Sequence, residues 1–159
     1  MVIQISNEQE VAVDEDSLAE LAGYVLAAER VGDDAELSIA LVGEETMLDL
    51  NTSYRGKDYP TDVLSFEAGG DMPTAGNLPR LLGDVVICPS VAEQQAVEFE
   101  QTLSEELSLL LVHGILHLLG YDHERDEDAE LMEARERLIL TSFSGGVNPD
   151  ELAKGGFER

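Results

Sequence analysis

Alternating apolar and polar residues predict a strand near the N-terminus, and helical spacing follows it. Residues 2–5 alternate in hydrophobicity, whereas the apolar residues after Ser17 recur every three or four positions, which is typical of one buried helix face. Similar patterns predict strands over 36–42, 62–66 and 81–88, a short extended piece over 11–13, and helices beginning near residues 44, 89, 102 and 126. This order, which starts strand, helix, strand, helix, predicts an α/β (α+β) fold.

Three predicted helix starts carry the capping-box pattern, in which a serine or threonine is followed three residues later by glutamate. The pairs are Ser17 with Glu20, Ser90 with Glu93, and Thr102 with Glu105. In this arrangement the hydroxyl and the carboxylate each bind a free backbone amide at the start of the helix. We therefore expect helices to begin at these positions and Gly32 to close the first of them.

The segment 103–119 is apolar on nearly every side of the predicted helix. A helix without a polar face is buried, so we expect this one to run through the centre of the domain. A chain of 159 residues suffices for one domain, which we place at 1–142. The Gly- and Pro-containing stretch 69–79 is expected to form a surface loop, and the glycine-containing residues 143–159 are expected to form a flexible tail.

The charge of the chain restricts its partners. Nine Lys and Arg residues against 34 Asp and Glu residues give a formal net charge of −25, so any contact with RNA must be local. Cys88 is the only cysteine, which excludes an internal disulfide and predicts no disulfide-linked partner. The N-terminus lacks a signal-peptide pattern and no segment is long and apolar enough for a membrane span, so we expect a cytoplasmic protein that binds no membrane.

All three histidines of the chain lie within the eleven residues from His113 to His123. His113 and His117 are four positions apart and therefore share one face of a helix, while Gly120 can turn the chain so that His123 returns toward them. Three neutral imidazoles with no cysteine nearby are typical of a catalytic zinc site, whose fourth position stays open. We predict one zinc ion per chain, although nickel, cobalt or copper would accept the same ligands.

The histidine spacing is the same as in the metzincin protease signature, with one difference. Gly114 stands where those proteases carry a glutamate that acts as general base. A peptidase mechanism would therefore lack its proton acceptor. A peptidase-like zinc hydrolase is accordingly the weakest of the hypotheses for this chain.

Two cations, Arg55 and Lys57, stand close together in a chain that has few. The planar guanidinium of Arg55 matches the geometry of a phosphate, so the pair could form a local anion site. Both cations could equally form ion pairs with Asp58 and Asp62. The sequence alone leaves these two readings open.

Three blocks of this sequence together resemble the YbeY family, bacterial metal-dependent endoribonucleases that act in ribosomal RNA maturation. The blocks are the histidine segment 113–123, the segment 51–66, and the run Leu82-Gly83-Asp84-Val85-Val86-Ile87. The resemblance covers most of the chain, although Glu67 stands where relatives often have proline. It implies one domain with a small mixed sheet, covered by helices, and a central metal-binding helix.

The resemblance also implies a function and a set of partners. It implies cleavage of single-stranded RNA, maturation of the 3′ end of 16S ribosomal RNA, ribosome quality control, and contact with the small ribosomal subunit or its proteins. Arg55 corresponds to the arginine of the family's Tyr-Arg-Gly-Lys-Asp block, and we assign phosphate binding to it. Asp122 could act as a base or orient a histidine, and the base stays unassigned. The alternative hypothesis is a ribosome-assembly factor whose metal is mainly structural.

Overall fold

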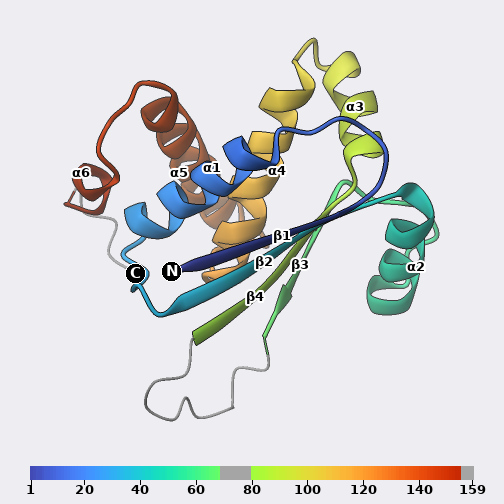
Figure 1. Cartoon of the computed structure of the whole chain (residues 1–159), viewed down its shortest axis with the longest axis horizontal. Coiled ribbons are helices and arrows are strands. Elements are labelled where there is room, and N and C mark those ends of the chain that lie inside the picture. The colour runs from blue at the N-terminus through green and yellow to red at the C-terminus, as the bar shows by residue number, and fades with distance from the viewer. Residues whose placement is uncertain (69–79, 155–159) are drawn as a thin grey trace.

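Four strands form one mixed sheet in the computed structural model, which describes residues 1–68 and 80–154 (Figure 1). In spatial order they are β1 (Val2–Glu8), β2 (Ala35–Val42), β4 (Arg80–Ile87) and β3 (Val63–Glu67). The first three are parallel, and β3 runs antiparallel to β4 at one edge. The predicted small mixed sheet is confirmed, while residues 11–13 form no strand.

Six helices accompany the sheet in the described ranges. They are α1 (Glu15–Ala28), α2 (Glu44–Arg55), α3 (Pro89–Glu98), α4 (Leu103–Leu118), α5 (Asp126–Ser144) and α6 (Pro149–Lys154). Figure 1 shows α1, α4 and α5 on one side of the sheet. Met47 of α2 instead joins a separate small cluster with Leu64 of β3 and Val86 of β4. The observed order of helices and strands confirms the α/β prediction.

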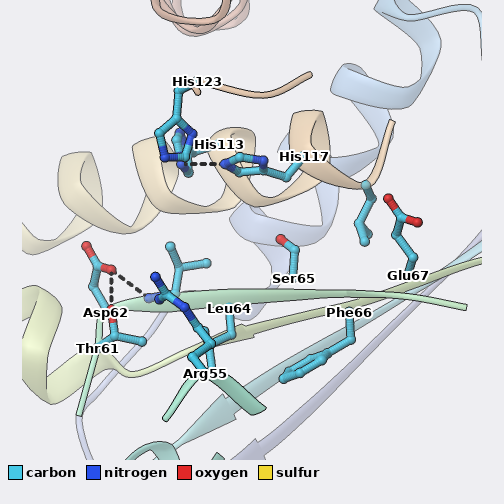
Figure 2. A pocket seen from close by; sticks show the side chains of 12 residues that line it. Arg55, Thr61, Asp62, Leu64, Ser65, Phe66, Glu67, His113, His117 and His123 are labelled. Atoms are coloured by element: carbon cyan, nitrogen blue, oxygen red, sulfur yellow. Dashed lines mark hydrogen bonds between the residues drawn. The ribbon is translucent and has the colours of Figure 1, made fainter. Parts of the chain in front are cut away.

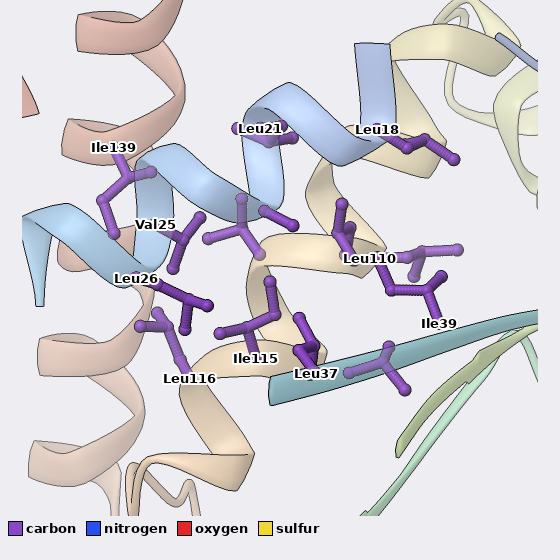
Figure 3. Packing of buried hydrophobic residues seen from close by; sticks show 14 of the residues in the cluster. Leu18, Leu21, Val25, Leu26, Leu37, Ile39, Leu110, Ile115, Leu116 and Ile139 are labelled. Carbon is purple, nitrogen blue, oxygen red and sulfur yellow. The ribbon is translucent and has the colours of Figure 1, made fainter. Parts of the chain in front are cut away.

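Helix α4 lies in the main core, as its apolar sequence predicts. Leu111 and Ile115 of this helix are fully buried and share a cluster with Leu37 and Ile39 of β2 (Figure 3). Helices α1 and α5 contribute Leu21 and Ile139, among others, to the same cluster. Because α4 is packed on several sides, the residues that it carries near its C-terminal end are held at fixed positions.

One of the three predicted capping residues is confirmed, and two are not. Thr102 forms the complete capping box, with both bonds at 3.0 Å. The cap of α1 is Asp14, whose Oδ1 accepts from the Ser17 amide at 3.1 Å, so the predicted Ser17 cap is wrong. Helix α3 begins at Pro89 as predicted, but Ser90 does not cap it, because the Ser90 hydroxyl donates to Glu44 Oε2 at 2.6 Å and thereby joins α3 to α2.

Part of the C-terminal segment packs against the main core. Helix α5 continues to Ser144, and Leu152 of α6 is buried in the main core at 8% exposure. The Tyr24 hydroxyl of α1 also donates to the Val147 carbonyl at 2.8 Å. Apolar side chains in the last segment therefore find a surface on α1, which the glycine content did not indicate. Residues 69–79 and 155–159 lie outside the described residues.

Helix α1 also ends earlier than predicted, at Ala28 rather than close to Gly32. None of the helices in the described ranges is both long enough and apolar enough to cross a membrane.

Candidate metal centre and cleft

The three histidines converge in the structure as their spacing predicts. One ring nitrogen from each of His113, His117 and His123 lies within 4.8 Å of the others. The Nε2 atoms of His113 and His117 are 3.1 Å apart. Two nitrogens that bind one tetrahedral zinc at about 2.0–2.1 Å are separated by roughly 3.3 Å. The donor set therefore fits a single metal ion with a position left for water or substrate.

A glycine turn brings His123 back to the helix. Gly120 follows α4 with a φ of +102°, and its amide donates to the His117 carbonyl at 3.1 Å. The next residue, Tyr121, is tied to the body of the domain because its hydroxyl donates to Glu29 Oε1 at 2.8 Å. Glu29 also accepts from Arg135 Nε of α5 at 2.6 Å. The loop that carries His123 is thus anchored to two helices.

Glu136 of α5 orients the first histidine. Its Oε1 lies 2.5 Å from Nδ1 of His113, and Glu136 is 7% exposed. A carboxylate that accepts from Nδ1 leaves the Nε2 lone pair free for a metal ion and makes the imidazole a stronger ligand. Asp122, the residue that we considered for this role from the sequence, is exposed. The signal that would have identified Glu136 is a charged residue on the buried stripe of an otherwise amphipathic helix.

The protonation of His117 also suits a ligand. Burial lowers the pKa of this imidazole, and the neighbouring imidazoles of His113 and His123 lower it further. A lowered pKa keeps the imidazole neutral at neutral pH. Neutral imidazole is the form that binds a metal ion.

Gly114 has a structural role that the sequence did not reveal. A Cβ at this position would lie 2.7 Å from Val85 Cγ1 and 3.2 Å from Ser65 Oγ. The Gly114 carbonyl accepts a hydrogen bond from that same Ser65 hydroxyl at 2.8 Å. Glycine therefore lets α4 lie directly on β3 and β4. A glutamate here would meet the sheet, so this site cannot carry the metzincin base at this position.

The histidines form one wall of a cleft of about 670 Å³. Figure 2 shows them on the α4 side, with Arg55 and the side chains of β3 across from them. Arg55 is the last residue of α2, and it is exposed. Neither Arg55 nor Lys57 forms an ion pair with Asp58 or Asp62. The structure thus decides against the ion-pair reading and places Arg55, but not Lys57, on the cleft.

The loop between Arg55 and β3 is held by Asn51, which is completely buried. Its side-chain Nδ2 donates to the Tyr59 carbonyl at 2.8 Å, and its backbone carbonyl accepts from the Lys57 amide at 3.2 Å. Gly56 caps α2 with a φ of +66°, a conformation that favours glycine. The segment around Arg55 is therefore a folded turn that fixes one wall of the cleft.

The chain is similar to known proteins over most of its length. A sequence model described as "Endoribonuclease YbeY" matches residues 4–144. A protein of that name from Thermobifida fusca is 48% identical over 87% of this chain and 92% of its own. Another, from Beutenbergia cavernae, is 46% identical over 91% of this chain and 99% of its own. The solution structure of TM1509 from Thermotoga maritima has a TM-score of 0.58 at 29% identity, over 91% of this chain and 93% of that one.

Proposed function

The chain belongs to the endoribonuclease YbeY family, and from this premise we propose that its histidine cleft hydrolyses phosphodiester bonds of RNA with one bound metal ion. The observation that carries the proposal is the convergence of three ligand nitrogens within 4.8 Å on a cleft that Arg55 also lines. A closed structural metal site would not need such a cleft. The geometry therefore favours catalysis over the assembly-factor alternative.

His113, His117 and His123 would hold the ion, and we propose zinc as the physiological metal, with nickel or another divalent transition metal as the alternative. Such an ion supplies an activated water nucleophile and a positive charge beside the phosphate. Glu136 contributes by holding the His113 ring in one tautomer and orientation.

Arg55 is proposed to bind the phosphate that is cut. Its guanidinium makes no ion pair with the described residues, so it is available to an anion. The planar fork can donate two parallel hydrogen bonds to phosphate oxygens, and its charge offsets the charge that develops during hydrolysis. Because the rest of the chain is strongly acidic, this arginine supplies the local positive charge that an RNA strand needs.

The proton of the attacking water must leave to a group other than residue 114. Among the described residues that line the cleft, the carboxylates are Asp62 and Glu67. Asp62 is the better fixed of the two, since its Oδ1 accepts from the Val63 amide at 2.8 Å and from the Thr61 hydroxyl at 3.3 Å. Asp122 does not line the cleft. The base is therefore to be sought by replacing Asp62 and Glu67 separately with their amides.

For the substrate, we propose single-stranded RNA, specifically the 3′ end of 16S ribosomal RNA during maturation and ribosome quality control. A formal net charge of −25 opposes binding of long duplex RNA along the surface. Basic ribosomal proteins of the small subunit would complement that charge, so they are the proposed partners, and the cytoplasm is the proposed compartment.

The test combines metal content with RNA cleavage. Plasma mass spectrometry of the purified protein should find about one ion per chain, and His117→Ala should lose both the ion and cleavage of a single-stranded oligonucleotide. Arg55→Ala should keep the ion but lower the cleavage rate about 100-fold. Arg137→Ala, which removes an exposed arginine of α5 away from the cleft, is the matched control and should change neither.

Two results would decide against the proposal. A metal-loaded protein that cuts no RNA but still associates with ribosomes would favour the assembly-factor alternative. A protein without metal under all loading conditions would contradict the site itself.

A further inference from the structure

A second cleft, of about 460 Å³, adjoins the histidine cleft and has no role in the mechanism above. The two clefts share Asp62, Val63, His113 and His123. The other walls of the second cleft come from α3, α4 and α5. A strand whose phosphate lies at the histidines would therefore have its neighbouring nucleotide at the mouth of this second cleft.

A fixed set of hydrogen-bonding groups lines one wall of the second cleft. With its amide nitrogen facing two carboxylates, Gln95 of α3 donates to Asp62 Oδ2 at 3.0 Å and to Glu106 Oε1 at 3.1 Å. Glu106 is only 5% exposed. A carboxylate has two oxygens and about four acceptor positions, so Glu106 can accept a further donor beside the Gln95 amide.

The second cleft is also lined by six apolar residues, Val63, Phe99, Leu109, Leu110, Ala129 and Met132, one of which is an aromatic ring at the surface. Phe99, just after α3, is 64% exposed although it is a large apolar residue. Leu110 and Met132 also line this cleft, and both are buried. Exposed aromatic rings next to a nucleic-acid path commonly stack on bases, because every base has a flat π-face. Apolar side chains beside polar groups that are fixed in place are typical of a site for a small organic group.

We propose that this second cleft binds the base of the nucleotide next to the cut, with Phe99 against its face and Glu106 accepting from its amino group. This inference rests on the proposed RNA cleavage. A phosphate is unsuited to the cleft because Asp62, Glu106, Glu133 and Glu136 all line it. Cytosine, adenine and guanine each carry an exocyclic amino group that donates to a carboxylate, whereas the ring N3–H of uracil lies between two carbonyl oxygens that a carboxylate repels. The second cleft should therefore discriminate against uridine at one position beside the cut.

The experiment uses single-stranded oligonucleotides that carry cytidine, uridine or an abasic residue at each position flanking the cut. At one position, the abasic residue should lower kcat/KM about 5- to 150-fold, and uridine should lower it about tenfold relative to cytidine. Phe99→Ala should lower the rate on the normal substrate and remove most of the abasic penalty. Val97→Ala changes an exposed residue of α3 that does not line the cleft, and as the matched control it should change neither.

A second variant tests the hydrogen-bonding wall. Glu106→Gln keeps the shape of the side chain but adds a donor, so it should reduce the discrimination against uridine while preserving the melting temperature. Glu93→Gln, an exposed residue of α3, should leave the discrimination as it is. Equal rates with all bases and with the abasic residue would overturn the inference while the proposed function stands.

A binding measurement keeps the inference testable if no RNA is cut. An oligonucleotide with 2-aminopurine at the flanking position should lose fluorescence on binding to chelator-treated protein, and Phe99→Ala should abolish this quenching. If the protein cut no RNA, the proposed function would fail. If, in addition, no quenching occurred, the inference that the second cleft binds a nucleotide base would be overturned as well. Quenching that persists in Phe99→Ala would overturn the assignment of the ring.

Discussion

Replacing Gly114 by alanine tests whether the metal-binding helix depends on direct contact with the sheet. The new Cβ would lie 2.7 Å from Val85 Cγ1, about 1 Å closer than the roughly 3.5–4.0 Å optimum for two carbon atoms. Val85 is completely buried, so its methyl group cannot move into solvent. Either α4 or the sheet must shift, and His113 and His117 would shift with the helix.

A second helical glycine offers a matched control. Gly23 of α1 would place its Cβ 3.7 Å from Ile3 Cδ1, which is ordinary van der Waals contact. Alanine stabilises a helix interior by about 1 kcal/mol relative to glycine at either position. Only Gly114→Ala adds an overpacking cost, which is about 1–3 kcal/mol for an extra methyl group in a filled core. Gly23→Ala should therefore raise the free energy of unfolding by about 1 kcal/mol.

For Gly114→Ala, the gain in helix propensity and the overpacking cost together predict that the free energy of unfolding falls by about 0–2 kcal/mol. The difference between the two variants, about 1–3 kcal/mol, measures the packing cost directly because the helix term cancels. Urea unfolding followed by far-UV circular dichroism gives this difference. The measurement should be made with chelator, since bound metal adds its own stabilisation. Each kcal/mol corresponds to a change of about 2–4 °C in Tm at this chain length.

One result would refute the reasoning. If Gly114→Ala stabilised the protein as much as Gly23→Ala, the helix would not be held against the sheet at this point. A double variant tests the cause: Val85→Ala removes the methyl group that the new Cβ would meet. The double variant Gly114→Ala with Val85→Ala should be more stable than the sum of the single effects by about 0.5–3 kcal/mol. Strict additivity would assign the destabilisation to another contact.

Three further predictions follow from single contacts. Glu136→Ala should weaken metal binding about 10- to 100-fold, because the His113 ring loses its orienting acceptor, whereas the exposed Glu130→Ala should not change an affinity titration with zinc. Leu152→Ala should lower the free energy of unfolding by about 2 kcal/mol in a denaturant titration, since this side chain is 8% exposed, and an effect near zero would mean that α6 does not stabilise the domain. Thr102→Ala should cost about 1 kcal/mol in the same titration by removing the cap of α4, and an unchanged midpoint would contradict that assignment.

The local features of this protein follow from its sequence because they depend on residues that are close along the chain. The spacing of His113 and His117 places both rings on one helix face whatever surrounds the helix, and Gly120 permits the turn that returns His123. The capping box at Thr102 is equally local. The strands and the buried helix α4 could be predicted from hydrophobic patterns, because these patterns show which faces are buried without specifying what they pack against. Competition between neighbouring caps was less predictable, and Asp14 took the position expected for Ser17.

Only the tertiary structure decided the groups that complete the site, since these come from segments distant in sequence. Glu136 reaches His113 across 23 positions because α5 packs beside α4. Arg55 at the end of α2 lines the same cleft as His113 and His117 of α4, although these residues are far apart in the sequence. In the sequence, Gly114 stands where the metzincin proteases carry their general base. The structure shows that a Cβ at this position would lie 2.7 Å from Val85 Cγ1 of β4, so glycine is needed there for packing. Helical geometry is a property of the local chain, whereas these contacts depend on how whole elements pack against one another.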